Sequence, residues 1–230
     1  MDVFDDLPPE GWRGGFLSSL PEEAARSLLA GAIRISIPAG AIAYREEEVP
    51  RVLLVMDGLF RVFLRSGDGR QVTVRYARRG DVTGLALVLG GPGPMSVQAM
   101  TSGSVAAVRV EALRSMLASD PRVTRVCAEE LTRHLYLALD DLSEQAFLSV
   151  RQCLIRHLLD LATLGTGPQL VVRATQQGLA DAVGTVREVV TRTLRGLRKD
   201  GLLETSRDEI ILLDPVALHE ELADRERGNP

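Results

Sequence analysis

Residues 175–203 read TQQGLADAVGTVREVVTRTLRGLRKDGLL, and this stretch carries the densest structural signals in the chain. Apolar residues recur at helical spacing in two short segments, which predicts one helix over about 176–183 and a second over about 186–200. Gly184 lies between the two segments and permits a tight turn. Two short helices around a glycine turn predict a helix-turn-helix.

The second predicted helix has one apolar face and one charged face. Val190, Leu194 and Leu197 form the apolar face, and charged and hydroxyl side chains fall on the opposite face at i, i+4 spacing. Residues 185–199 contain five basic side chains and one glutamate, so the segment is net +4 inside a chain of net charge −4. A nucleic-acid interface is therefore indicated by this local patch and not by the charge of the whole chain.

We expect the charged face to enter the major groove of DNA, where Arg reads guanine and Glu reads cytosine at about 1–3 kcal/mol of discrimination each. Arg195, Arg198 and Lys199 are expected to neutralise phosphates. The predicted DNA-binding residues are Arg187, Glu188, Arg192, Thr191, Thr185, Arg195 and Lys199. An alternative stays open, because Thr185 and Glu188 also fit a capping box at the start of the helix.

The flanking segments complete a winged helix-turn-helix. The segment ETSRDEIILLD reads as a two-strand wing with Arg207 and Asp208 at its tip. Asp214 and Pro215 fit the N-cap and the first position of a last short helix. Upstream, VRQCLIRHLLDLATL predicts a helix that ends at the Gly/Pro turn of residues 165–168.

The first half of the chain has the periodicity of a β-sheet. From about residue 31 to 110, short alternating apolar runs are separated by turn signals such as PAG, DG and SGDG. Regularly spaced short strands of this kind predict an antiparallel sandwich or barrel. The helical segment EALRSMLAS closes this β module.

A long helix is expected from Pro121 onward. Apolar residues recur there at alternating spacings of three and four, namely Ala128, Leu131, Leu135, Ala138 and Leu142. Because this stripe has no obvious partner inside its own subunit, we expect it to pack against a second copy in a two-fold dimer. The alternative is that the stripe covers the β module. The predicted domains are a β domain over 1–120, a dimerisation helix over 121–147 and a DNA-binding domain over 148–230.

The order of these parts resembles the Crp/Fnr family, the cyclic-AMP receptor protein and fumarate–nitrate regulator family of bacterial transcription regulators. The segment VGTVREVVTRTL looks like the family's recognition helix, with its R-E-x-x-x-R reading residues at Arg187, Glu188 and Arg192. The segment QAFLSVRQCLIRHLLDLA, residues 145–162, is similar to the family's hinge and first DNA-binding helix. Val186 stands where the family commonly has Ser, a departure that weighs against a phosphate contact at that position.

The resemblance implies an α+β fold made of three parts. These are an N-terminal antiparallel β-roll of the cyclic-nucleotide-binding jelly-roll type, a long dimerisation helix and a C-terminal winged helix-turn-helix. It also implies a transcription regulator that binds double-stranded DNA as a homodimer on a two-fold operator, with RNA polymerase as a further partner.

The resemblance assigns a role to residues 84–97, GLALVLGGPGPMSV, which we call the cassette. In relatives that bind cyclic AMP, the cassette begins Gly-Glu-Leu with the Glu on the ribose, and it ends Arg-Ser with the Arg on the cyclic phosphate. A Thr-Ser pair on the long helix often assists. The matching residues here lack those charged and paired polar groups: Gly84, Leu85 and Ala86, then Met95 and Ser96, then Ala138 and Leu139. Because a buried phosphate needs a cationic partner, we expect no cyclic AMP binding.

Several occupants of this effector pocket stay open. Leu85, Leu87, Leu89 and Met95, with the two helix residues, either enclose a small apolar molecule or form a packed core in a regulator without an effector. Haem and an atypical nucleotide are further alternatives, although the β module contains no His. Arg75 or Arg78 would partly compensate a phosphate, but the sequence does not place either at the pocket.

Motifs and composition argue against other classes of protein. The chain lacks H-E-x-x-H, G-x-S-x-G and the glycine-rich nucleotide motifs, so we expect no enzyme activity, and we expect no cofactor. Cys127 and Cys153 are expected to be small buried residues. Glu130 and His134 have the spacing of a metal pair, but a solvated helix face is the favoured interpretation. The N-terminus lacks signal-peptide features and no apolar run is long enough to span a membrane, which predicts a cytoplasmic protein without a membrane partner.

Overall fold

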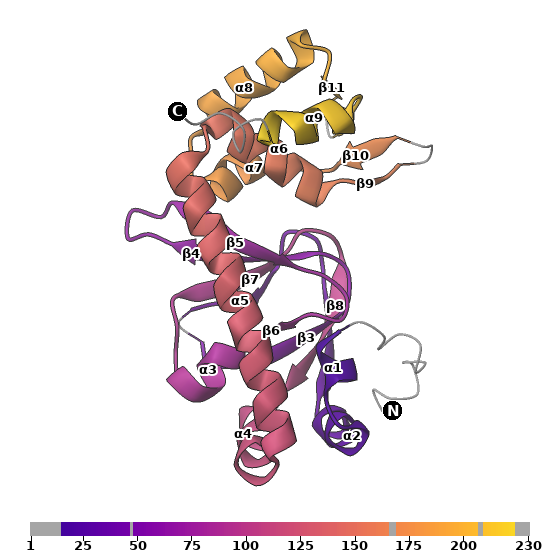
Figure 1. The fold of residues 1–230 in the computed structure, drawn as a ribbon, viewed down its shortest axis with the longest axis vertical. Coiled ribbons are helices and arrows are strands. Elements are labelled where there is room, and N and C mark those ends of the chain that lie inside the picture. Colours follow the sequence, from indigo (N-terminus) through magenta and orange to yellow (C-terminus); the bar gives the residue numbers. More distant parts are fainter. Residues whose placement is uncertain (1–14, 47, 166–168, 207–208, 224–230) are drawn as a thin grey trace. The chain divides into compact units, whose positions relative to one another are not determined.

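The computed structural model describes residues 15–46, 48–165, 169–206 and 209–223 (Figure 1). The predictions for the N-terminal segment, for the turn at 166–168 and for Arg207 and Asp208 at the wing tip lie outside these residues. The chain divides into two compact units, one formed by residues 1–65 and 74–140 and the other by residues 66–73 and 141–230. Each unit is described by itself.

Two four-stranded sheets form the β-roll. The first sheet contains, in order, β1 (Ile33–Ile37), β8 (Gly103–Val108), β3 (Val52–Asp57) and β6 (Val82–Thr83). The second contains β2 (Ile42–Tyr44), β7 (Met95–Ala99), β4 (Phe60–Arg65) and β5 (Gln71–Ala77). Strand β3 pairs antiparallel with β8 and β6, and β7 pairs antiparallel with β2 and β4. The predicted antiparallel β module is confirmed.

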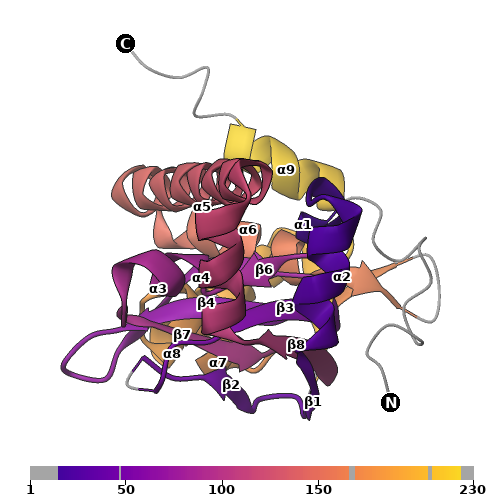
Figure 2. The ribbon, with the colours of Figure 1, turned by 90° about the horizontal axis from the view of Figure 1, so that it is seen from below.

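Strand β3 is buried on both faces. Val52, Leu54 and Met56 belong to a core shared with the helices, whereas Leu53 and Val55 belong to the core between the two sheets. A strand that is covered on both sides reads as a continuous apolar run, which explains why VLLVM does not alternate. Figure 2 shows helices on one side of β3, with β7 and β2 on the other.

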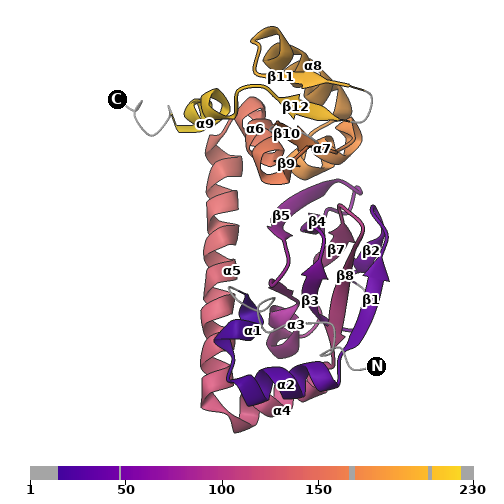
Figure 3. The same cartoon turned by 90° about the vertical axis from the view of Figure 1, so that its right-hand side faces the viewer.

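Helices cover the outer face of the first sheet. They are α1 (Phe16–Ser19), α2 (Glu22–Ala30), α4 (Val110–Ser119) and the start of α5 (Pro121–Phe147). Helices α2 and α4 lie side by side (Figure 3), and Leu28, Leu29 and Leu113 from the two helices are almost fully buried. The helix predicted from EALRSMLAS is α4, whereas α1 and α2 were not predicted.

Helix α5 has two apolar faces. Val123 and Cys127 are buried, and Leu131 packs against the same core, so this face covers the β module. Leu135 and Leu142 of the predicted stripe are 56% and 63% exposed. The expectation that the stripe has no partner inside its own subunit is therefore wrong for Leu131, because the first turns of α5 complete the core above the first sheet.

From α6 onward, the described part of the second unit contains four helices and four short strands. In chain order they are α6 (Val150–Leu161), β9 (Thr163–Leu164), β10 (Leu170–Val172), α7 (Gln176–Val183), α8 (Arg187–Lys199), β11 (Leu203–Thr205), β12 (Ile210–Leu212) and α9 (Pro215–Ala223). The strands form one sheet in the order β11-β12-β10-β9. Its core includes Leu154, Leu158, Leu179 and Leu197, all fully buried.

The helix predicted to continue to residue 164 ends earlier. Helix α6 stops at Leu161, and Ala162 has an extended backbone with φ −62° and ψ 133°. Thr163 and Leu164 pair instead with Val171 and Leu170 of β10. The prediction was wrong because ATL continues the apolar spacing of the helix without a Gly or Pro, and pairing with β10 outweighs that spacing. The wing strands therefore belong to a four-stranded sheet.

Candidate nucleic-acid interface and sensor cassette

The helix-turn-helix consists of α7, a short turn and α8. Thr175 caps α7, since its Oγ1 accepts a hydrogen bond from the N–H of Gly178 at 3.0 Å. Gly184 has φ 74°, a left-handed conformation that glycine adopts without steric cost. Thr185 N then donates to the Ala180 carbonyl oxygen at 3.0 Å, which fixes the turn to α7. The predicted glycine turn is confirmed.

Helix α8 separates its residues into a buried and an exposed face. Val190, Leu194 and Leu197 are buried, as predicted. The charged residues predicted to contact DNA are exposed: Arg187, Glu188, Arg192, Arg195 and Lys199. A helix held by its apolar face thus presents a net positive face to solvent, which suits phosphates and base edges.

The capping box considered for Thr185 and Glu188 is wrong. The N-cap residue of α8 is Val186, whose hydrocarbon side chain has no hydrogen-bond acceptor. Thr185 is half-buried and precedes the N-cap residue by one position. Its backbone N–H donates to Ala180 of α7, so Thr185 belongs to the turn and not to α8. Glu188 lies exposed in the first turn of α8, where the helix dipole favours a carboxylate.

Thr191 has an internal partner that the sequence does not indicate. Its Oγ1 lies 2.7 Å from Gln176 Oε1 and 2.9 Å from the Arg187 carbonyl oxygen. The Thr191 hydroxyl therefore joins α8 to the first residue of α7 in the free protein.

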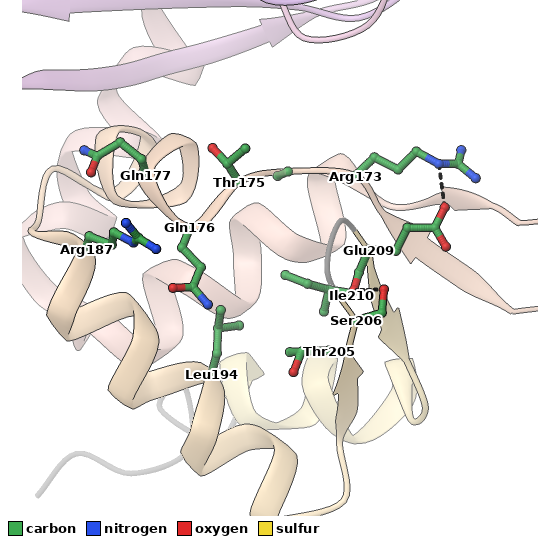
Figure 4. Close-up of a pocket in the computed structure, with 11 residues that line it drawn as sticks. Arg173, Thr175, Gln176, Gln177, Arg187, Leu194, Thr205, Ser206, Glu209 and Ile210 are labelled. Carbon is green, nitrogen blue, oxygen red and sulfur yellow. Dashed lines mark hydrogen bonds and ion pairs between the residues drawn. The ribbon is translucent and has the colours of Figure 1, made fainter.

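A groove with a volume of about 690 Å³ lies between α8, the start of α7 and the wing (Figure 4). Polar groups from all three line it: Arg173, Thr175, Gln176, Gln177, Arg187, Thr205, Ser206 and Glu209. Across the groove, Arg173 Nε donates to Glu209 Oε1 at 2.8 Å and links the segment before α7 to the wing. Sequence reasoning missed Arg173, Gln176 and Gln177. The signal that points to them is their place at the start of a helix, where backbone N–H groups favour phosphate.

The cassette contains a short helix, α3 (Leu85–Gly90), that its Gly/Pro content did not predict. Gly84 has φ 86°, and a Cβ there would lie 2.1 Å from the Arg51 carbonyl oxygen. Leu85 packs in the core under the helices and Leu87 in the core between the sheets. Leu89 is 66% exposed, so the expectation that it encloses a pocket is wrong.

The other predicted pocket residues differ in burial. Ala86 is exposed, Met95 is half-buried and Ser96 is buried. On α5, Ala138 is half-buried, whereas Leu139 is 49% exposed. The predicted pocket residues therefore range from buried to exposed, and they do not form one buried lining.

Ser96, at the end of the cassette, is bound to a carboxylate. Its hydroxyl donates to Glu46 Oε2, and the Glu46 backbone N–H donates to Ser96 Oγ at 3.2 Å. Glu46 follows strand β2, and sequence reasoning missed it because fifty residues separate it from Ser96. An anion brought to Ser96 would meet a like charge.

Glu130 and His134 on α5 do not form a solvated face. Glu130 accepts from Arg133 Nη2 at 2.6 Å and lies 3.0 Å from His134 Nε2, and its side chain is only 13% exposed. Arg133 also lies 3.6 Å from Asp81, the residue before β6. The interpretation of Glu130 and His134 as a solvated helix face is therefore wrong, because this part of α5 lies against polar groups of the β-roll.

Arg75 on β5 belongs to the same polar region. Its Nη2 donates to the Val82 carbonyl oxygen at 2.8 Å, and burial lowers its pKa to about 10 despite the nearby Asp81. Among the residues that the structure describes, no group of three or more His, Cys, Asp or Glu side chains is arranged to hold a metal ion. None of the described helices is both long and apolar enough to cross a membrane.

Comparison with known proteins identifies both units. The chain matches the cyclic nucleotide-binding domain over residues 34–120 and the Crp-like helix-turn-helix domain over residues 152–221. It is 30% identical over 185 residues to the transcriptional regulator LdrP of Thermus thermophilus, covering 78% of this chain and 91% of that protein. The chain belongs to the Crp/Fnr family.

One further relative and one solved structure are also similar to this Crp/Fnr regulator. A CRP-like cAMP-activated global transcriptional regulator of Mycobacterium tuberculosis is 27% identical over 214 residues, covering 90% of this chain and 95% of that protein. A crystal structure assigned to the crp/fnr family, from Eubacterium rectale, has a TM-score of 0.78 at 19% identity, covering 90% of this chain and 96% of that one. The protein is a Crp/Fnr transcription regulator with a DNA-binding helix-turn-helix, and these relatives are regulators, not enzymes.

Proposed function

We propose that this regulator acts as a homodimer that reads a two-fold operator through α8, and that its β-roll does not take up cyclic AMP. The observation that carries the proposal is the division of α8, whose apolar face is buried while its basic face is exposed. On this basis we call α8, Arg187–Lys199, the recognition helix.

In this proposal the two ends of the recognition helix have different tasks. Arg187 and Glu188 lie in its first turn, the part of such a helix that enters the major groove, and Arg192 lies one turn further on. Arg195 and Lys199 hold phosphates and set the register. Thr185 supports the turn and Thr191 the joint between the helices. The groove beside the wing, lined by hydroxyl, amide and guanidinium groups, suits the passing DNA backbone.

Selection from random duplex DNA tests the readout. We expect selected sequences to share two inverted half-sites about 10–10.5 base pairs apart, the spacing of two recognition helices related by a two-fold axis. Binding should weaken steeply with salt, as phosphate contacts require. Selected sequences without inverted symmetry would contradict the proposal.

The second face of α5 supports the homodimer. Leu135, Tyr136, Leu139 and Leu142 are all between 49% and 63% exposed on this one helix. Exposed apolar patches on soluble proteins commonly mark an interaction site. A second copy of the same helix, related by a two-fold axis, would cover this surface and pair two recognition helices on one operator.

Three features argue against cyclic AMP in the β-roll. Leu85 and Met95 replace the charged residues that hold ribose and phosphate in cyclic-AMP-binding relatives, and the Glu46 carboxylate already binds Ser96. A phosphate there would be buried beside a like charge without a cation, which costs several kcal/mol. The burial of Leu85 and Leu87 in the two cores favours a regulator without an effector.

The alternatives are a small apolar ligand, haem or an atypical nucleotide in the β-roll. Native mass spectrometry of the purified protein separates them, because each would add a distinct mass to the dimer. As a transcription regulator, the DNA-bound dimer has RNA polymerase as its expected further partner, and we expect it to act in the cytoplasm.

A further inference from the structure

Arg151, in the first turn of α6, lies where three helices meet. Its Nε and Nη2 donate to the two carboxylate oxygens of Glu221 on α9, at 2.6 and 3.0 Å. Its Nη2 also lies 2.8 Å from Oδ2 of Asp200, the C-cap residue of the recognition helix. One guanidinium therefore joins α6 to the end of the recognition helix and to α9.

The chemistry of this junction requires arginine. A planar guanidinium binds a carboxylate through two parallel N–H groups and keeps further donors for a second acid, whereas an ammonium is a point charge. Asp200 places a negative charge at a helix C-terminus, which the helix dipole disfavours, and Arg151 supplies the opposite charge there. The hydrogen bond to Glu221 raises the pKa of Arg151 above its ordinary value, so the guanidinium stays charged.

Two neighbours restrict the position of Arg151. Gln152 Nε2 donates to the Glu221 carbonyl oxygen at 3.3 Å, and Gln152 also forms the capping box of α6 with Ser149. On the recognition helix, a Cβ on Gly196 would lie 3.4 Å from Arg151 Nη1. The guanidinium therefore lies directly beside the backbone of the recognition helix at this position.

We propose that Arg151 is a positioning residue for DNA recognition, which sets the angle of the recognition helix by fixing its C-terminal end to α6 and α9. This inference rests on the proposed readout by Arg187 and Glu188. The recognition helix is about 20 Å long, and those two residues lie at the end opposite Asp200. A small tilt at the Asp200 end therefore displaces the base-reading residues, and base contacts require placement to within about 0.5 Å.

A positioning role and a direct phosphate contact by Arg151 predict opposite results. If Arg151 fixes the helix, Arg151→Met lowers affinity for the selected operator about tenfold, within the range of one weakened base contact. Affinity for unrelated DNA and the salt slope should change less than twofold. The double variant Asp200→Asn with Glu221→Gln keeps the arginine but removes its anchors, so it should reproduce the loss.

The same double variant decides against a direct contact. With its acidic partners removed, an Arg151 that binds phosphate would strengthen binding to all DNA and steepen the salt dependence. That result, or equal loss on operator and unrelated DNA in Arg151→Met, would overturn the proposal. Arg151→Lys should recover part of the operator affinity. Arg156→Met, on the same helix and paired with Asp160, is the matched control and should leave the ratio of the two affinities unchanged.

A measurement without DNA separates this inference from the proposed function. Amide hydrogen exchange in the last turn of the recognition helix, around Leu197 and Lys199, should speed up several-fold in Arg151→Met and not in Arg156→Met. Unchanged exchange would refute the positioning role even if Arg187→Ala abolished operator preference. Faster exchange combined with a neutral Arg187→Ala would instead refute the readout and keep the anchoring role of Arg151.

Discussion

The buried Ser96 hydroxyl donates a hydrogen bond to the carboxylate of Glu46, fifty residues earlier in the chain. The chain thus brings its own negative group to the end of the cassette. A ligand that presents an anionic group to Ser96 has to displace the Glu46 carboxylate or bind beside its negative charge.

Cyclic AMP should therefore leave the melting temperature of the protein unchanged. A bound ligand at 100 times its dissociation constant would stabilise the fold by about 2.7 kcal/mol, which a thermal-shift titration detects readily. The double variant Glu46→Gln with Met95→Arg removes the carboxylate and supplies a cation, so it should gain a shift with cyclic AMP. Glu48→Gln with Met95→Arg keeps Glu46 and is the matched control. A clear upward shift of the unmodified protein would show that the expected exclusion of cyclic AMP is wrong.

Arg187→Ala and Lys199→Ala should have different effects on DNA binding. Loss of Arg187 should cost about 1–3 kcal/mol at one operator position and relax the preference there. Loss of Lys199 should weaken binding to every sequence and reduce the salt slope by about 0.9 for each subunit of the dimer. Mobility-shift titrations at several salt concentrations, with operator and scrambled DNA, distinguish the two. An unchanged preference in Arg187→Ala would mean that the base-reading role is misassigned.

Leu135→Lys combined with Leu139→Lys should dissociate the dimer. Both side chains are about half-exposed on one face of α5, and burying a leucine contributes about 1.5–3 kcal/mol. Because the two-fold axis doubles each loss, the dissociation constant should rise roughly a thousandfold or more. Analytical ultracentrifugation over a range of concentrations measures this. Ile33→Lys, at an exposed isoleucine of β1 away from α5, should leave the dimer intact.

The polar region of α5 should make stability fall on acidification. Burial lowers the pKa of His134, so below about pH 6.5 the unfolded chain takes up a proton that the folded chain resists, and the free energy of unfolding decreases. Burial alone would raise the pKa of Glu130, but hydrogen bonds from Arg133 and His134 outweigh it and lower the pKa to about 2. The stabilisation from Glu130 is thus complete above about pH 4.5 and is lost as the pH falls toward 2.

Urea denaturation between about pH 7.5 and 2.5 measures both parts of this pH dependence. His134→Gln keeps a hydrogen-bond donor for Glu130 but does not titrate, so its stability should depend less on pH between 7 and 5.5. Glu130→Gln should flatten the dependence below pH 4.5. A His134→Gln profile parallel to that of the unmodified protein would assign the upper part of the slope to other groups.

Gly84→Ala should destabilise the β-roll by at least about 2 kcal/mol. Its φ of 86° disfavours any Cβ, and the added carbon would lie 2.1 Å from the Arg51 carbonyl oxygen, so backbone has to move. Gly69 is the matched control: its φ is 84°, but a Cβ there meets no described atom within 4 Å. Gly69→Ala should therefore cost only the conformational strain, about 1–2 kcal/mol. Equal losses of the free energy of unfolding in urea titrations of the two variants would show that the contact with the Arg51 carbonyl oxygen does not contribute.

The helix-turn-helix was predictable from sequence because its signals are local. Gly184 marks the turn, and the buried row of Val190, Leu194 and Leu197 has the period of one helix. The end of α6 was not predictable, since Thr163 and Leu164 leave the helix only to pair with β10. The spacing of apolar residues therefore sufficed where the deciding contacts are between residues close in sequence. It failed at the end of α6, where pairing with the later strand β10 replaces the helical conformation.

The sensor unit was predictable as a β-roll but not in its contacts. Leu131 and Leu135 belong to one apolar stripe in the sequence, yet Leu131 packs on the β module and Leu135 is exposed. Likewise, nothing near Ser96 in the sequence indicates Glu46, and nothing near His134 indicates the buried charge of Arg75. These relationships depend on tertiary proximity, which periodicity does not encode.

Strand β3, buried on both faces, lacks a safeguard that most strands possess. A one-residue slip of a half-solvated strand would turn its apolar side chains to water, which penalises the wrong alignment. Within VLLVM the same slip merely exchanges one apolar side chain for another. Correct alignment with β8 has to come from the irregularity between Val55 and Asp57, opposite Val105 and Ser104. We therefore expect the polar end of β3 at Asp57, and not its apolar middle, to determine the register between β3 and β8 during folding.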